Sequence, residues 1–267
     1  MADRDPRGPV AGDRDPLGSL AAVVAASLFG MLGPLTRLAG DAGLPGIGMT
    51  AWRALLGVVF LVVLIVLSGG MGESVAAVRG LSRHGRAMLA IAALSGFVLN
   101  AAIFSAFGLA PVALVLMMFY TYPAGVAVVD VVTGHERLTR WRGAALALSM
   151  GGVVLVLAGG SAPDSATPSL VLGVVLGLVA SAAQVVFVTA SRSGYRTVPA
   201  PAATALIMAT AVVGASAVAV VAGQGAELLV PLTTPAVWPY ILLAGIAAAG
   251  ISSSLFLVAI RRIGGTR

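Results

Sequence analysis

Eight long runs of apolar residues dominate the chain, separated by short stretches that are polar or rich in Gly and Pro. Each run has about 20 residues or slightly more, and a helix of that length spans the hydrocarbon core of a bilayer, which is about 30 Å thick. The runs are continuous, whereas the strands of a membrane barrel alternate polar and apolar residues. They predict eight transmembrane helices, at residues 18–39, 47–68, 87–108, 111–132, 141–160, 170–191, 200–222 and 237–260.

The composition agrees with this prediction. Hydrophobic residues make up 59% of the 267 residues and charged residues 10%, whereas an ordinary soluble domain has about 25% charged residues. A soluble protein of this size has no interior large enough to cover so much apolar surface. The chain is therefore expected to be an all-α membrane protein with several spans.

The segments between the runs are expected to be tails and loops. Residues 1–17 contain the sequence DRDP twice and are predicted to be a disordered tail. The Gly- and Arg-rich stretch 69–86, the Pro- and Ser-rich stretch 161–169 and the stretch 223–236 are each predicted to be a loop between two spans.

The arginines predict how the spans are oriented. All sixteen basic residues are Arg; fourteen of them lie in alternate connecting segments, Arg37 lies in an intervening one and Arg53 lies within the second run. Because Arg accumulates in cytoplasmic loops, both termini are predicted to be cytoplasmic in a multi-pass protein of the cell membrane. The net charge of +6 thus reflects topology, and no nucleic-acid partner is expected.

Residues for catalysis or metal binding are scarce. The chain has no Cys, and its two histidines, His84 and His135, both lie in charged connecting segments. Neither a metal site, a disulfide nor a nucleotide-binding loop is expected. We therefore predict no cofactor and no enzymatic activity.

Three of the spans repeat at a constant offset of 154 residues. Thr50-Ala51 aligns with Thr204-Ala205, Gly96 with Gly250, and Ala26-Ser27 with Ala180-Ser181. Five spans separate the copies, and because five is odd the two copies face opposite sides of the membrane. Such an inverted-topology repeat is a common construction of secondary transporters.

The repeat predicts two units of unequal length. Residues 18–160 form a first five-helix copy, and residues 168–267 form a second copy with three helices, an incomplete 5+3 arrangement. Arg267 aligns with Ala113, at the start of the fourth span, so counterparts of the fourth and fifth spans are expected in a longer, ten-helix protein. A natural eight-helix variant is the alternative.

Two spans contain residues that weaken a helix. The fourth span has Tyr120-Thr121-Tyr122-Pro123 near its middle, and the first has Gly30, Gly33 and Pro34. A span interrupted at mid-depth is typical of a transport pathway. Gly30, Gly33, Pro34 and Pro123 are therefore candidate hinges, and the alternative for the first span is a tight helix crossing at small residues.

Polar residues from four spans are predicted to lie at similar depth. They are Asn100, Tyr120, Thr121, Tyr122, Gln184 and Ser252 to Ser254. If their helix faces converge, they form a neutral hydrogen-bonding pocket with aromatic walls, which makes Asn100, Tyr120, Tyr122 and Gln184 candidates for the substrate pathway. The alternative is ordinary packing of membrane helices through polar side chains, the favoured interpretation for the three serines.

Charged residues near the spans allow several roles. Arg53 either extends to the outer interface or faces the cavity and attracts a carboxylate or phosphate. Asp130, near the cytoplasmic end of the fourth span, is a candidate proton carrier, because proton coupling needs an acidic side chain buried near the pathway. Glu136 is expected to be structural, capping the next helix or pairing with Arg137, Arg140 or Arg142.

One motif resembles a known family. Pro123 is followed by Glu136-Arg137-Leu138, then by Gly143 and Gly151-Gly152-Val153. This order resembles the EamA-like family of the drug/metabolite transporter superfamily, and residues 29–34 and Trp52-Arg53 resemble parts of its first two helices. The resemblance implies a fold of ten helices in two inverted five-helix repeats, and transport of metabolites, amino acids or drugs.

These observations predict a secondary transporter. It would move a small organic metabolite, an amino acid or drug-like solute, across the cytoplasmic membrane by alternating access, with export favoured over import on family grounds. Its expected partners are that small-molecule substrate and the lipid bilayer, while proton coupling and a homodimer are left open. The alternative is a non-transporting membrane scaffold or assembly subunit.

Overall fold

The computed structural model describes residues 16–133, 168–192 and 194–263, with a few single positions between 143 and 155. Every regular element in these ranges is helical, and seven helical segments are long and apolar enough to cross a membrane. Their elements are α1 (Pro16–Gly30) with α2 (Leu32–Asp41), α3 (Gly46–Leu67), α5 (Arg83–Phe107), α6 (Val112–Phe119) with α7 (Tyr122–Val132), α9 (Pro168–Ser191), α10 (Ala200–Val221), and α12 (Trp238–Gly245) with η3 (Ile246–Ile251) and α13 (Ser252–Ile263).

Seven of the eight predicted spans therefore correspond to observed helices. The remaining predicted span, residues 141–160, falls almost entirely outside the described residues, as do Glu136 and most of the tail 1–17. A continuous apolar run that lies in lipid must form a helix, because only a helix satisfies all of its backbone N–H and C=O groups within one segment. The apolar runs therefore predict the positions of these spans.

The loop prediction for residues 69–86 is wrong. The stretch contains a helix, α4 (Met71–Arg79), which has Glu73 in its first turn and Arg79 in its last turn. Both charges complement the helix dipole. Gly69 at φ +70° ends the preceding α3, and Ser82 Oγ caps α5 by accepting a hydrogen bond from Gly85 N at 3.0 Å. Gly70 and Gly80 flank this helix, so the glycines that suggested a loop only mark where the short helix begins and ends.

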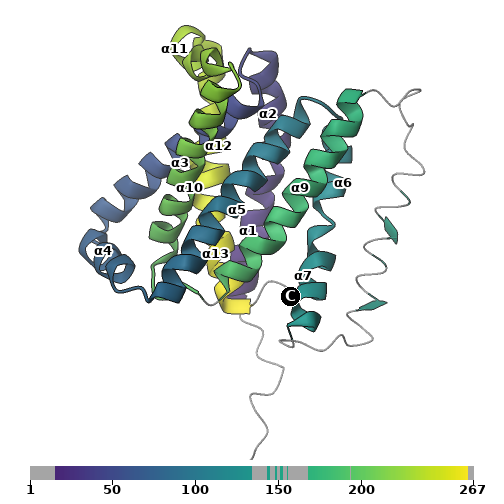
Figure 1. The fold of residues 1–267 in the computed structure, drawn as a ribbon. Coiled ribbons are helices and arrows are strands. Elements are labelled where there is room, and N and C mark those ends of the chain that lie inside the picture. Colours follow the sequence, from purple (N-terminus) through teal and green to yellow (C-terminus); the bar gives the residue numbers. More distant parts are fainter. Residues whose placement is uncertain are drawn as a thin grey trace, which may run out of the picture.

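The stretch 223–236 also differs from the predicted loop. It contains three short helices, namely η1 (Gly225–Leu229), α11 (Val230–Thr233) and η2 (Pro235–Val237). They lie over the ends of α10 and α3 at the upper end of the molecule in Figure 1. There Trp52 Nε1 donates to the Leu228 carbonyl at 2.9 Å, which ties this segment to α3.

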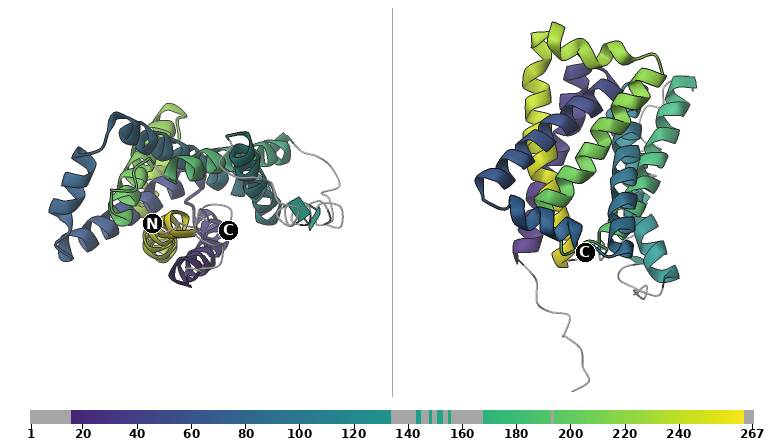
Figure 2. Two further views of the ribbon diagram at one scale, coloured as in Figure 1. Left: turned by 90° about the horizontal axis from the view of Figure 1, so that it is seen from below. Right: turned by 60° about the vertical axis from the view of Figure 1, so that its left-hand side comes forward.

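The helices pack in a bundle whose central contact is α3 against α10. On one side of this pair α5 packs against α9 and α10, and α6 and α7 pack against α9 (Figure 1). On the other side α12 and η3 pack against α3, and α13 packs against α1, as the two views of Figure 2 show. Segments far apart in sequence thus form the centre.

Small residues bring these helices close together. Seven of the ten buried residues of α10 are alanines, at positions 200, 202, 203, 205, 211, 215 and 219. Large apolar side chains instead face outward, such as Val213 at 70% exposure and Leu94 at 60%. This is the pattern of a membrane protein, in which van der Waals packing at small residues holds helices together and large apolar side chains face lipid.

Candidate functional site

Three of the spans are interrupted. The first divides at Met31, between α1 and α2, and the fourth divides at Tyr120 and Thr121, between α6 and α7. The last span contains the π-helical turn η3. The interruption of the fourth span falls at the polar cluster in which the sequence predicts a weak point. Thr121 Oγ1 there bonds the Met118 carbonyl at 2.7 Å and Ser181 Oγ of α9 at 2.8 Å.

A cavity of about 380 Å³ lies among the seven spans. Both divided spans contribute to its wall, α1 and α2 through Phe29, Gly30 and Gly33, and α6 and α7 through Phe119 and Tyr122. Its volume falls within the range of small-molecule sites, about 300–1,000 Å³. Residues on α3, α5, α9, α10 and α13 complete the wall, so no single helix forms it.

All five residues predicted for the substrate pathway line this cavity: Arg53, Asn100, Tyr120, Tyr122 and Gln184. They come from α3, α5, the α6–α7 junction, α7 and α9, and only the tertiary fold brings them together. Of the predicted hinge residues, Gly30 and Gly33 also line it, whereas Pro34 and Pro123 do not. Their placement fits the predicted roles without testing them.

The three serines of the last span behave differently from one another. Ser253 lines the cavity, although packing was the favoured interpretation. Ser252 is buried and donates to the Ala248 carbonyl of η3 at 2.5 Å, in the manner of a packing residue. Ser254 Oγ is buried and has no hydrogen-bond partner.

Arg53 lies inside the bundle. Its side chain is 2% exposed, so it does not extend to the outer interface. Its Nη2 donates to Asn100 Oδ1 at 2.5 Å, and its guanidinium lies 4.7 Å from the centre of the Phe104 ring. Asn100 in turn donates from Nδ2 to the Gly96 carbonyl at 2.6 Å. α5 therefore holds Arg53 of α3 at the cavity wall.

Sequence reasoning missed most of the aromatic wall. Six of the eight Phe residues of the chain line the cavity, at positions 29, 104, 107, 119, 187 and 256. Phe119 lies between Tyr120 and Tyr122, with ring centres 5.4 and 5.2 Å away, and Phe29 meets Phe256 edge-on at 5.8 Å. Aromatic residues are few in these mostly aliphatic spans, so the positions of the few phenylalanines could have indicated the cavity wall.

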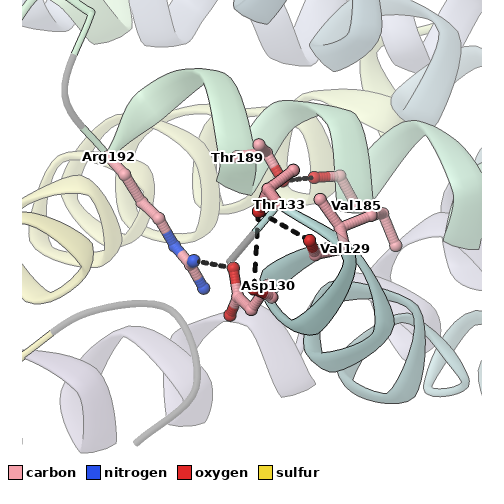
Figure 3. A network of polar contacts seen from close by, with 6 residues as sticks. All are labelled: Val129, Asp130, Thr133, Val185, Thr189 and Arg192. Carbon is pink, nitrogen blue, oxygen red and sulfur yellow. Dashed lines mark hydrogen bonds and ion pairs between the residues drawn. The ribbon is translucent and has the colours of Figure 1, made fainter. Parts of the chain in front are cut away.

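A buried ion pair lies outside this cavity, near the end of α7 (Figure 3). Asp130 is 3% exposed, and its Oδ1 accepts a hydrogen bond from Nη1 of Arg192, which directly follows α9. Two threonines near this pair bond to their own helices: Thr133 Oγ1 donates to the Val129 carbonyl, and Thr189 Oγ1 donates to the Val185 carbonyl (Figure 3). Asp130 thus joins α7 to the end of α9, and its role as a proton carrier stays a prediction.

The fold and the cavity define a class of protein: a multi-pass helical membrane protein with an internal polar and aromatic chamber. A family model described as the EamA-like transporter family matches residues 16–158, more than half of the chain. The chain therefore belongs to the EamA-like transporter family. This membership indicates a membrane transporter of small solutes.

Comparison with other proteins adds the fold alone. A search of curated proteins gives no match. One solved protein crystal structure is similar over 91% of this chain and 80% of the other, with a TM-score of 0.63 and 19% sequence identity. Among the described residues, no group of three His, Asp or Glu side chains is placed to hold a metal ion.

Proposed function

We propose that the protein is a secondary transporter that moves a small organic metabolite, an amino acid or drug-like solute, across the cell membrane by alternating access. The observation that carries this proposal is the cavity, which combines polar and aromatic groups from all seven described spans at the level of the helix interruptions. Polar groups are costly at membrane depth unless they line a cavity or a pathway. Export is favoured over import on family grounds.

The packing supports an inverted repeat with copies at residues 18–160 and 168–267. If the first three spans of each copy correspond, a two-fold axis in the membrane plane relates the contact of α5 with α9 to that of α13 with α1. It likewise relates the contact of α5 with α10 to that of α12 and η3 with α3. All four contacts are present, and α3 and α10, which also contact each other, would be related by the same axis.

Two aligned glycines support the same axis. A Cβ added at Gly96 of α5 would lie 3.0 Å from Ile207 of α10, and one added at Gly250 of η3 would lie 2.8 Å from Phe60 of α3. Each glycine thus lets the third span of one copy approach the second span of the other. The 5+3 arrangement with eight membrane helices is part of this proposal.

The predicted hinges fit two different tasks. A Cβ added at Gly33 would come within 2.8 Å of Val112 of α6, so Gly33 allows close approach between the two divided spans. At Gly30 a Cβ would meet nothing within 4 Å, so that residue is free of a packing requirement. We propose Gly30, with Pro34 and Pro123, as the points where the divided spans bend.

Reconstitution tests the function. The purified full chain in liposomes is expected to move at least one labelled solute from a panel of amino acids and small metabolites. Asn100→Ala and Tyr120→Ala are expected to lower that rate about tenfold or more, because each removes a polar or aromatic group from the cavity wall. A pH gradient imposed across the same liposomes tests whether transport is coupled to protons. If Asp130 is the proton carrier, Asp130→Asn should remove the effect of the gradient on the transport rate.

Val213→Ala is the matched control, because this residue of α10 is 70% exposed on the outer face and does not line the cavity. Its transport rate is expected to equal that of the unaltered protein. If no solute moves and the cavity substitutions change no phenotype in cells, the protein is a membrane scaffold or assembly subunit instead.

A further inference from the structure

Arg53 has no acidic partner in the part of the chain that the structure describes. Among the residues that the structure describes, four are acidic: Asp41, Glu73, Asp130 and Glu227. Asp130 pairs with Arg192, Glu227 accepts from Gly48 N at 3.2 Å, and no described carboxylate lies within 4.0 Å of the Arg53 guanidinium. Arg53 Nε is buried and makes no hydrogen bond. A buried, unpaired cation is costly, and such groups in membrane helices ordinarily face a counter-charge or a ligand.

The other described residues that line the cavity supply no negative charge. Its polar lining consists of amides and hydroxyls, those of Asn100, Gln184, Tyr120, Tyr122, Thr204 and Ser253. Asn100 offers its amide oxygen to Arg53, which orients the guanidinium without neutralising it. The cavity thus holds one fixed positive charge, and its electrostatic field favours anions and disfavours cations.

The remaining wall is apolar and aromatic. Phe104 lies against the guanidinium, and Phe119 with the two tyrosines forms a continuous aromatic cluster. Aromatic side chains bind the flat or aliphatic body of a ligand through area burial and ring stacking. The Arg53 cation beside these aromatic walls matches a ligand that has one negative charge at one end and an apolar body.

We propose that the cavity selects organic monoanions, whose carboxylate pairs with Arg53 while the apolar or aromatic body lies among the phenylalanines and tyrosines. This proposal gives the substrate class of the transport function proposed above and rests on that function. The single arginine also distinguishes between anions, because a phosphate monoester with two charges would leave one of them without a partner. A guanidinium pairs with a carboxylate through two parallel N–H donors, and the free Nε of Arg53 is one such donor.

Binding to the purified full chain tests this selection through ligands that share a phenethyl body and carry head groups of different charge. Titration calorimetry at pH 7 would compare 3-phenylpropanoate, 3-phenylpropan-1-ol, 2-phenylethylamine and phenethyl phosphate. The carboxylate is expected to bind at least tenfold more tightly than the alcohol and the amine, the size of effect that a charged hydrogen bond provides. It is also expected to bind more tightly than the phosphate.

Two variants test whether Arg53 causes the preference for the carboxylate ligand. Arg53→Gln is expected to abolish the preference for the carboxylate over the alcohol. Asn100→Asp keeps the shape of the side chain and places a carboxylate where the Asn100 amide oxygen now accepts from Arg53. It supplies an internal counter-charge and should also abolish the preference, whereas a purely structural Arg53 would leave binding unchanged. Arg79→Gln, at the exposed end of α4, is the control and should bind as the unaltered protein does.

The outcomes separate this proposal from the transport function. Equal or tighter binding of the alcohol, the amine or the phosphate overturns the monoanion assignment, as does an unchanged preference in Asn100→Asp. Absence of carboxylate binding overturns it as well. If the charge preference holds but liposomes show no flux of any of these ligands, the monoanion site stands and the transport function fails.

Discussion

At the scale of single residues, glycine sets the distance between helices around the cavity. Gly245 of α12 faces α3, where an added Cβ would lie 2.6 Å from Leu56 Cβ and 3.1 Å from the Arg53 carbonyl oxygen. Gly57, one turn further along α3, faces Met208 of α10 in the same way, at 2.8 Å. The backbone that carries Arg53 is therefore held in place by contacts that only glycine permits.

Gly245→Ala is expected to destabilise the protein by about 1–3 kcal/mol, because the methyl group would overlap backbone and Cβ atoms that cannot move independently. The measurement is thermal or denaturant unfolding in detergent. Gly40→Ala is the control, since an added Cβ there meets nothing within 4 Å and alanine favours the helix. Equal stability of the two variants would contradict the close packing described for α12 and α3.

At the scale of elements, the interrupted spans need partners that replace the continuity they lack. The α6–α7 junction bonds to α9 through Thr121 and Ser181, and the far end of α7 bonds to the end of α9 through Asp130 and Arg192. α9 thus supports both ends of α7. These two attachments hold the short helix α7 against α9 along its length.

Asp130→Asn is expected to lower the free energy of unfolding by about 2–3 kcal/mol, because it leaves the mostly buried Arg192 charge without its counter-charge. Arg192→Gln should have a similar effect. The double variant should recover much of the loss, since neither charge then remains unpaired, and a double-mutant cycle in detergent measures this coupling. Strictly additive losses would show that the pair contributes little.

The interruptions and the ion pair differ in how far the sequence predicted them. The clusters Tyr120 to Pro123 and Gly30 to Pro34 signalled helix weakness directly, since Pro and Gly act on the backbone of their own segment. The pairing of Asp130 with Arg192 could not be predicted, because it depends on how α7 and α9 pack. The helix α4 was missed for a related reason, since Gly-rich ends hid a short helix with few periodic positions.

At the scale of the whole molecule, most of the described arginines lie at one end of the bundle. α4, the start of α5 and the end of α13 lie at the lower end in Figure 1, and α2 and α11 lie at the upper end. The described arginines other than Arg37 and Arg53 belong to the lower group, at positions 79, 83, 86, 192, 196, 261 and 262. The positive-inside rule predicts that this end faces the cytoplasm.

Labelling of single cysteines tests this orientation, and the natural absence of Cys makes the chain a ready background. Gln224→Cys, between α10 and η1, is expected to react with an impermeant maleimide in intact cells. Glu73→Cys, on α4, is expected to react only after the membrane is permeabilised, and both positions are exposed. The reverse pattern would show that the arginine-rich end faces outward.

The sequence by itself determined the membrane class, the positions of the seven described spans and the interruption of the fourth, because apolar length and backbone hydrogen bonding in lipid are local requirements. It also named five polar and charged residues without deciding where their side chains lie. Only the tertiary structure decided that they meet in one cavity, that Arg53 lies there with no acidic partner among the described residues, and that phenylalanines from separate helices line it. Such contacts depend on which helix faces meet, and a nearly uniform apolar span does not encode its contact face in any local pattern.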